Sequence, residues 1–164
     1  MTMTQTLTEE KLQERVRTAL KDVKDPEIPT LSLEELGMVY SISVSGREVR
    51  IELIPTFVGC PAIELIRRLV AKKVEAVDGI ESVQVTFVMD VPWTSDRITA
   101  EGRAKLQAFG IAPPPREFTP RSAPSCPYCG ASETDVVSLF GPTACRSIFY
   151  CKSCQQPFEG MKYV

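Results

Sequence analysis

Four cysteines near the end of the chain have the spacing of a metal site. Cys126 and Cys129 form one C-x-x-C pair, and Cys151 and Cys154 form a second, separated from the first by 21 residues. Each pair directs two sulfur atoms toward one point, so two pairs supply four thiolates in a tetrahedral arrangement. Gly130 follows the first pair, where a positive φ is useful for the turn. A segment of about 40 residues buries too little apolar surface to fold by itself, so we expect a bound metal to hold it together.

The spacing favours zinc but does not exclude iron, because the same four thiolates can hold either ion. Cys145 lies between the two pairs, and we interpret it as a buried residue of a short strand. Two alternatives stay open for Cys145: it replaces one of the paired cysteines as a ligand, or it belongs to a second, labile site.

The sixth cysteine, Cys60, stands apart in the sequence TFVGCPAIELI, residues 56–66. A strand is predicted to end before it and a helix to begin at it, with Pro61 in the first turn. The unpaired N–H groups of a helix start favour a thiolate, so Cys60 is a candidate nucleophile or metal ligand. The alternative is that Cys60 is a small buried side chain at a helix start.

Composition limits the chemistry that these thiols can join. The chain of 164 residues contains no histidine, which excludes Ser-His and Cys-His catalysis and any histidine-ligated metal. Its net charge of -2 gives no attraction for nucleic acid or an anionic membrane. No apolar run is long enough to span a bilayer, and the N-terminal residues do not resemble a secretory signal. We expect a cytoplasmic protein with reduced thiols.

Hydrophobic periodicity before residue 110 predicts helices and strands that position Cys60. We expect a helix, a β-hairpin turning at Ser45-Gly46, a crossover helix, a third strand and a final helix, at residues 8–22, 39–54, 61–77, 82–88 and 96–110. The strands on either side of the crossover helix should be parallel. The predicted fold class is α/β of the α+β kind, a small mixed sheet with packed helices followed by a zinc-ribbon-like β segment.

A proline-rich stretch, residues 111–125, divides the chain. Five prolines in this stretch favour an extended spacer and exclude a helix. We therefore predict three parts: a domain of residues 1–110, a linker of residues 111–125, and a four-cysteine domain of residues 126–164. Within the last part, residues 134–140 and 145–150 alternate like two short strands.

Four short motifs occur in an order that is similar to a known family: DPEI, LGMVYSI, TFVGCP and VPWTSDRIT, at residues 25–28, 36–42, 56–61 and 91–99. With the cysteine-rich tail, the chain resembles the SufT-like domain family of iron–sulfur assembly proteins, most closely its PaaD (PaaJ) branch. The resemblance covers nearly the whole chain. It implies that Asp25, Glu27, Thr56 and Cys60 fall on the family's motif positions, and that Cys60 acts in iron–sulfur cluster maturation.

The resemblance implies an accessory factor that is not an enzyme, serving the phenylacetyl-CoA 1,2-epoxygenase system of aerobic phenylacetate degradation. It would help to assemble an iron–sulfur or di-iron centre in a reductase or di-iron client subunit. Iron–sulfur assembly proteins or a second copy of the chain are further partners that it implies. A single thiol is too few for a stable cluster, so any cluster or iron would be held transiently.

Other interpretations of the same residues stay open. Asp25 and Glu27 can act as acid–base groups or iron ligands, or Asp25 can simply fix a surface turn. Cys60 can serve a thiol-dependent transfer or redox enzyme, although the missing histidine leaves it without the usual base. In a third interpretation the chain is a structural docking component of the oxygenase complex, and Cys60 is inert.

Overall fold

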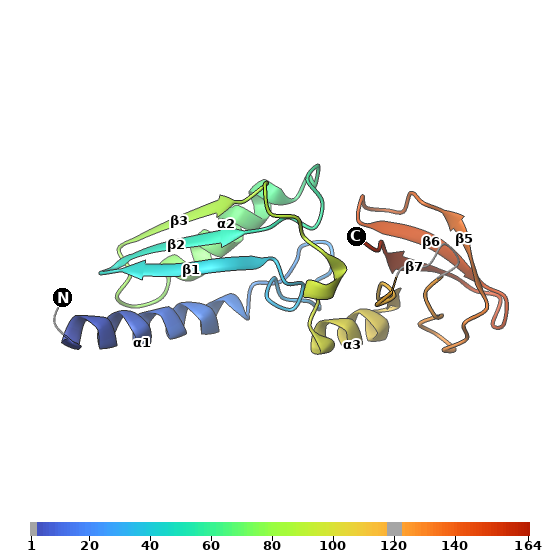
Figure 1. The fold of residues 1–164 in the computed structure, drawn as a ribbon, viewed down its shortest axis with the longest axis horizontal. Coiled ribbons are helices and arrows are strands. Elements are labelled where there is room, and N and C mark those ends of the chain that lie inside the picture. Colours follow the sequence, from blue (N-terminus) through green and yellow to red (C-terminus); the bar gives the residue numbers. More distant parts are fainter. Residues whose placement is uncertain (1–2, 118–122) are drawn as a thin grey trace. The chain divides into compact units, whose positions relative to one another are not determined.

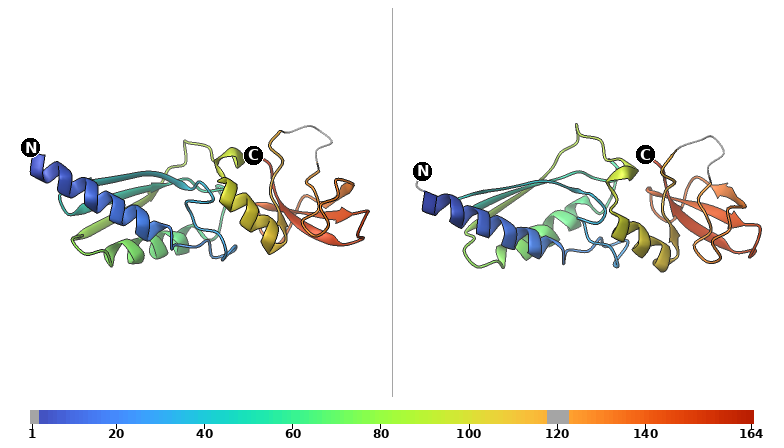
Figure 2. Two further views of the ribbon diagram at one scale, coloured as in Figure 1. Left: turned by 90° about the horizontal axis from the view of Figure 1, so that it is seen from below. Right: turned by 60° about the horizontal axis from the view of Figure 1, so that its bottom comes forward.

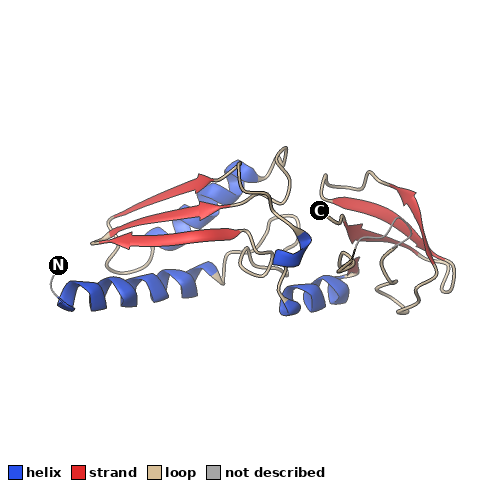
Figure 3. Cartoon of the chain, viewed as in Figure 1, coloured by secondary structure: helices blue, strands red, loops and turns tan. Residues whose placement is uncertain are grey.

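The computed structural model describes residues 3–117 and 123–164, with side chains from residue 8 onward. The chain forms two compact units that divide between Pro92 and Trp93. Each unit combines helices with one small β-sheet (Figures 1 and 3). No helix in the part of the chain that the structure describes is long and apolar enough to cross a membrane.

The first unit contains one three-stranded sheet and two helices. Its elements are α1 (Met3–Leu20), β1 (Val39–Ser45), β2 (Glu48–Leu53), α2 (Ile63–Glu75) and β3 (Ser82–Phe87). The strand order is β1-β2-β3, with β1 antiparallel to β2 and β2 parallel to β3. This confirms the predicted hairpin and the predicted parallel pair around the crossover helix. Helix α1 begins before residue 8, and α2 begins two residues later than its predicted start.

Both helices pack on the same face of this sheet (Figure 2). Every third or fourth side chain of each helix points to the sheet, as expected for an amphipathic helix. The core residues from the helices are Leu12, Val16, Leu20, Ile66, Val70 and Val74, and those from the strands are Ile42, Val49, Ile51, Leu53 and Val85. The opposite face of the sheet carries polar side chains such as Arg50 and Ser82, which are exposed. The alternation of period two therefore gives the sheet one buried and one open face.

The second unit is built around a four-stranded sheet. Its elements are η1 (Ser95–Arg97), α3 (Ala100–Phe109), β4 (Ile111–Ala112), β5 (Thr134–Ser138), β6 (Arg146–Cys151) and β7 (Pro157–Met161). The strand order is β4-β7-β6-β5. Around the sheet, one cluster of buried residues consists of Ala112, Cys126, Phe149, Cys151 and Phe158. The two units together confirm the predicted mixed α+β class with a β segment at the end.

Two features of the second unit differ from the sequence analysis. The proline-rich stretch begins as a strand, because Ile111 and Ala112 pair in parallel with β7. Helix α3, which we placed with the first domain, belongs to the second compact unit. Buried Arg103 explains this placement, since its guanidinium donates to the carbonyl oxygens of Pro114 at 2.6 Å and Ser95 at 3.0 Å. The three-part domain boundaries themselves stay a prediction.

Candidate functional site

The four paired cysteines converge on one point in the second unit. The sulfur atoms of Cys126, Cys129, Cys151 and Cys154 all lie within 4.8 Å of one another. The Cys126 and Cys154 sulfurs are 3.7 Å apart, and those of Cys129 and Cys151 are 3.6 Å apart. Four sulfurs at about 2.3 Å from a tetrahedral zinc would be separated by about 3.8 Å. The group therefore has the donor type and the spacing of a structural zinc site.

Backbone turns hold each C-x-x-C pair in this geometry. After the first pair, Gly130 has φ of 76° and its N–H donates to the carbonyl oxygen of Cys126 at 2.9 Å. After the second pair, Gln155 takes the same left-handed conformation, with φ of 59°. The glycine was recognisable in the sequence, whereas glutamine carries no signal for a positive φ. The two turns are thus alike in backbone although their sequences differ.

The thiol environments indicate why the group needs a cation. Backbone N–H donation from Cys154 lowers the pKa of Cys151 to about 7. Burial raises the pKa of Cys154 to about 12, and its contact with Cys151 adds to the rise. Neighbouring sulfurs at these distances cannot all carry a negative charge unless a positive ion compensates them. A zinc ion bound here would hold all four as thiolates and join the turns of the two pairs to each other.

Cys145 is not a member of the four-sulfur group. It is half-buried in the turn just before β6, so it is not the buried strand residue that we predicted. Its carbonyl oxygen accepts a hydrogen bond from the Lys162 N–H at 2.9 Å, and its sulfur lies 3.2 Å from the Thr143 hydroxyl. These contacts join the β5–β6 connection to the end of the chain.

Cys60 lies in the loop between β2 and α2 of the first unit and is half-buried. Its N–H donates to the carbonyl oxygen of Phe57 at 3.1 Å, which closes a turn. Helix α2 begins at Ile63 with Ala62 as its N-cap, so Cys60 and Pro61 precede the helix instead of occupying its first turn. The effect of a helix terminus falls off beyond the first turn. The thiol is therefore better described as a loop residue than as a helix-start residue.

Two side chains beside Cys60 are unusually exposed for their type. Phe57 is 45% exposed and Val58 is 70% exposed. A side chain at Gly59 would crowd this loop, because a Cβ there would lie 3.2 Å from the Phe57 ring. The sequence analysis missed Phe57 and Val58 as surface residues. Their position, three and two residues before an isolated thiol and outside any predicted element, was the available signal.

Asp25 and Glu27 lie in the loop between α1 and β1. The Asp25 side chain is 9% exposed, and its Oδ1 accepts the N–H groups of Glu27 at 2.7 Å and Ile28 at 3.1 Å. This is the loop-fixing role that the sequence left as an alternative. Because Val39 pairs with Leu53, this loop and the Cys60 loop leave the sheet at the same end (Figure 1).

Thr56, the remaining predicted site residue, is half-buried in the Cys60 loop. It follows Pro55 and precedes the exposed Phe57, between the end of β2 and the turn that Cys60 closes. The structure thus places the predicted site residues in two groups. Four lie in the two loops at one end of the first sheet, and the four paired cysteines meet in the second unit.

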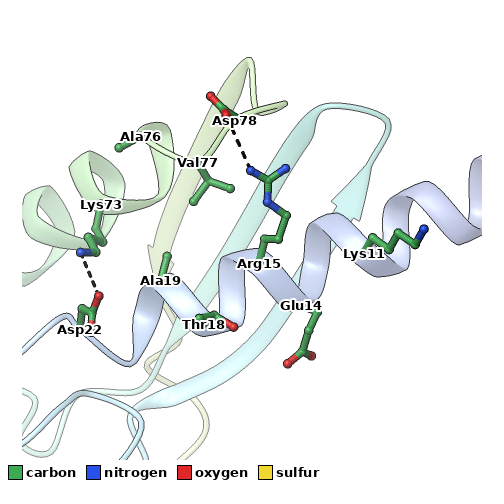
Figure 4. A pocket seen from close by; sticks show the side chains of 10 residues that line it. All are labelled: Lys11, Glu14, Arg15, Thr18, Ala19, Asp22, Lys73, Ala76, Val77 and Asp78. Atoms are coloured by element: carbon green, nitrogen blue, oxygen red, sulfur yellow. Dashed lines mark ion pairs between the residues drawn. The ribbon is translucent and has the colours of Figure 1, made fainter.

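A groove of about 760 Å³ lies between α1 and the C-terminal end of α2 (Figure 4). Two exposed ion pairs cross it, Arg15 to Asp78 at 3.9 Å and Lys73 to Asp22 at 3.2 Å. Basic and acidic side chains line it in equal number, together with small side chains such as Ala19. Cys60 precedes the other end of α2. The groove is thus a feature of helix packing without a dominant charge that would select a ligand.

The fold and the cysteines together define a two-part protein, with a thiol-bearing α+β unit followed by a four-cysteine β-ribbon. Comparison with known proteins gives the same division. The family model for iron-sulfur cluster assembly proteins matches residues 13–87, and that for the PaaD zinc beta ribbon domain matches residues 111–162. The chain is 35% identical over 148 residues to a protein of Escherichia coli (strain K12) that is named as a putative component of 1,2-phenylacetyl-CoA epoxidase, covering 88% of this chain and 89% of that protein. The chain therefore belongs to the PaaD family, in which an iron–sulfur assembly domain carries a zinc ribbon.

Other relatives match part of the chain. It is 32% identical over 95 residues to an Fe-S protein maturation auxiliary factor of Porphyromonas gingivalis, and the match covers 57% of this chain and 90% of that protein. A conserved hypothetical protein from Thermotoga maritima has the same fold, with a TM-score of 0.51 at 32% identity, over 60% of this chain and 94% of that one. A DUF59 domain from Bacillus anthracis aligns with a TM-score of 0.53 at 21% identity, over 62% of this chain and 96% of that one. The two solved structures confirm the fold over 62% and 60% of the chain. The names of the sequence relatives support an accessory or maturation role.

Proposed function

We propose that this protein is a maturation factor of a phenylacetyl-CoA epoxidase system, and that Cys60 is its transient iron or iron–sulfur ligand. The observation that carries the proposal is the setting of Cys60, a half-buried thiol in a loop, within an iron–sulfur assembly domain. The client would be the reductase subunit or the di-iron oxygenase subunit of that system. The protein would act in the cytoplasm, where thiols remain reduced.

The two thiol sites differ in the number of ligands that they offer a metal, which decides whether the metal is held permanently or passed on. Four thiolates close the coordination sphere of a metal, which makes the ribbon site structural. Cys60 offers one ligand, so an iron or cluster bound there would take its other ligands from another molecule. It could therefore be released to a client. Binding would require loss of the thiol proton to solvent, followed by a sulfur–iron bond that is broken when the client takes the metal. This difference in role explains why Cys60 stands apart from the four paired cysteines.

The proposal is tested by purifying the client subunits from cells that carry Cys60→Ala. We expect both the iron content and the activity of the client to fall, while the variant itself folds and keeps its zinc. Cys145→Ser is the matched control, because it removes a half-buried thiol outside the four-sulfur group. A client with full metal content in the Cys60→Ala strain would refute the proposal and favour the docking interpretation.

The thiol-enzyme alternative has no specific support in the structure. The chain contains no histidine to act as base toward Cys60, and the Asp25 oxygen that could serve is engaged with two backbone N–H groups of its own loop. Two of the relatives are named as Fe-S protein maturation auxiliary factors. Catalysis by this chain alone is therefore the weaker hypothesis.

A further inference from the structure

The solvent-facing side of α2 is not the polar surface that a helix on an open sheet normally presents. Leu65 is 43% exposed and Leu69 is 37% exposed, and they lie beside the buried row of Ile66, Val70 and Val74, on its solvent-facing flank. Spacing of three and four residues aligns Leu65 and Leu69 with the exposed Arg68 and Lys72. We call Leu65, Arg68, Leu69 and Lys72 the outer stripe of α2. It extends over about 10 Å of helix surface.

The two cations of the outer stripe have no carboxylate partner among the residues that the structure describes. Glu64 pairs with Arg67 at 3.2 Å, and Arg67 also lies over the Phe87 ring. Arg68 is left with a single long hydrogen bond, at 3.4 Å, to the carbonyl oxygen of Glu64. Lys73 is already paired with Asp22, whereas its neighbour Lys72 has no such contact. The outer stripe therefore presents two positive charges that have no carboxylate partner in the described part of the chain, and two leucines that remain exposed.

The outer stripe begins five residues after Cys60. The Cys60 loop, which leads into α2, adds two further exposed apolar side chains, Phe57 and Val58. Contiguous exposed apolar residues with a charged border mark interaction sites in proteins. Opposite charge across such a site orients a partner and excludes partners of the wrong sign.

We propose that the outer stripe of α2 docks an acidic, apolar surface segment of the client, which brings the client's metal site to Cys60. This rests on the proposed function, because the client is the one named there. Client leucine- or phenylalanine-like side chains would cover Leu65 and Leu69, and client carboxylates would pair with Arg68 and Lys72. The partner is thus defined by two requirements, an apolar contact and at least two negative charges at matching positions.

Binding measurements with the full chain test this docking surface. The probes are the purified reductase and di-iron oxygenase subunits of the epoxidase from the same organism, each immobilised in turn. We expect Arg68→Glu/Lys72→Glu to weaken binding of the client about tenfold or more, and raised salt to weaken the wild type. The control Lys11→Glu/Arg17→Glu reverses two exposed cations on α1 and should bind as the wild type does. Thermal unfolding of each variant shows that the folds are equal.

Each result of these measurements has a consequence. Normal binding by Arg68→Glu/Lys72→Glu, equal loss in both double variants, or no binding of either client by the wild type would overturn the docking surface. Cys60→Ala separates the two proposals, since it should bind the client normally but leave it without metal. If Cys60→Ala fails in maturation while the stripe variant binds and matures the client fully, the proposed function stands and the docking surface falls.

A photo-crosslinking amino acid at position 65 identifies what covers the stripe in the reconstituted mixture. We expect a crosslink to a client peptide that contains Asp or Glu beside apolar residues, and none from the same group at position 17. A crosslink from position 65 to a basic peptide, to this chain itself or to a second copy, or no crosslink at all, would contradict the proposal.

Discussion

Replacement of Asp25 distinguishes a loop-fixing carboxylate from an iron ligand or acid–base group. Its Oδ1 holds two backbone N–H groups, those of Glu27 at 2.7 Å and Ile28 at 3.1 Å, in a buried position. The Asp25 N–H also donates to the carbonyl oxygen of Leu31 at 2.9 Å, which brings the two ends of the turn together. Asp25→Ala removes the acceptor of both N–H groups, whereas Asp25→Asn retains an oxygen in the same place and removes only the charge.

The size of each effect follows from these contacts. A hydrogen bond to a charged group contributes about 1.5–3 kcal/mol. Ile28 keeps part of its pairing through the Asp25 carbonyl oxygen at 3.3 Å. We therefore expect Asp25→Ala to lower the free energy of unfolding of the first unit by about 2–4 kcal/mol and Asp25→Asn by about 1 kcal/mol. For a unit of roughly 90 residues, these values correspond to falls in Tm of about 10–25 °C and about 5 °C.

Circular dichroism at the helical minimum follows the first unit, because α1 and α2 supply most of the helix in the chain. Client maturation is then measured with each variant at a temperature where it remains folded. Loop fixing predicts a large loss of stability in Asp25→Ala and maturation near the wild-type level in Asp25→Asn. The reasoning is refuted if Asp25→Ala melts within a degree or two of the wild type, or if the well-folded Asp25→Asn cannot mature the client.

Three further changes test the second unit. Cys151→Ser should release its zinc and unfold the ribbon, while Cys145→Ser should retain the metal; equal zinc contents by elemental analysis would contradict the assignment of the four-sulfur group. Gly160→Ala should cost about 1–3 kcal/mol in urea unfolding, because a Cβ there would lie 2.7 Å from the Phe149 ring, and an unchanged midpoint would mean that the ring has room to move. Arg103→Met removes the guanidinium donor of the Pro114 carbonyl oxygen, while the Ser95 carbonyl oxygen keeps the Ile98 N–H at 3.2 Å. It should cost about 1.5–3 kcal/mol by the same measurement; a loss under about 1 kcal/mol would show that these bonds do not hold α3 in the unit.

The local sequence was sufficient to predict the hairpin, the end of α3 and the pairing of the strands on either side of α2. The Ser45-Gly46 signal and the alternation on either side of it predicted the hairpin. The turn itself lies one residue later, at Gly46 and Arg47, because Ser45 pairs with Glu48, and Gly46 has a φ of 62°. The stop of α3 at Gly110 was also readable, since this glycine caps the helix with φ of 90°. The parallel pairing of β2 and β3 followed from the length of the crossover between them.

Strands β4 and β7 could not be predicted, because tertiary contacts make them strands. Residues 111–112 stand at the start of a proline-rich stretch, and only their pairing with β7 gives them a strand conformation. Strand β7 begins with Pro157 and contains Gly160, both of which weaken a strand signal. In the structure Gly160 is useful, since it lets the Phe149 ring approach, and that ring stacks on Phe158 at 5.5 Å. Neither contact can be inferred from the local sequence.

The site was predictable to the extent that ligand spacing alone decides it. Two C-x-x-C pairs specify a four-sulfur group whatever lies between them, and the structure brings those four sulfurs together. The outer stripe of α2, by contrast, could not be predicted from residue spacing alone. Helical periodicity already places Ile66 and Val70 on the core-facing stripe of α2. It does not show how far Leu65 and Leu69, which lie beside that stripe, are exposed, and only the packing of α2 on its sheet determines this.

Neither a lone thiol nor a docking surface would be sufficient for metal delivery. Because the two are close in the sequence, a client bound to one would lie near the other. One sulfur cannot retain iron without further ligands. A client held on α2 would place its own metal ligands near Cys60. Metal transfer would then be an intramolecular step with a high effective concentration of those ligands. Loss of the stripe would then be compensated by a higher client concentration, whereas loss of the Cys60 sulfur would not. If both proposals hold, the two defects differ in kind: loss of the stripe would lower how often the client binds, and loss of the thiol would prevent transfer of metal to a bound client.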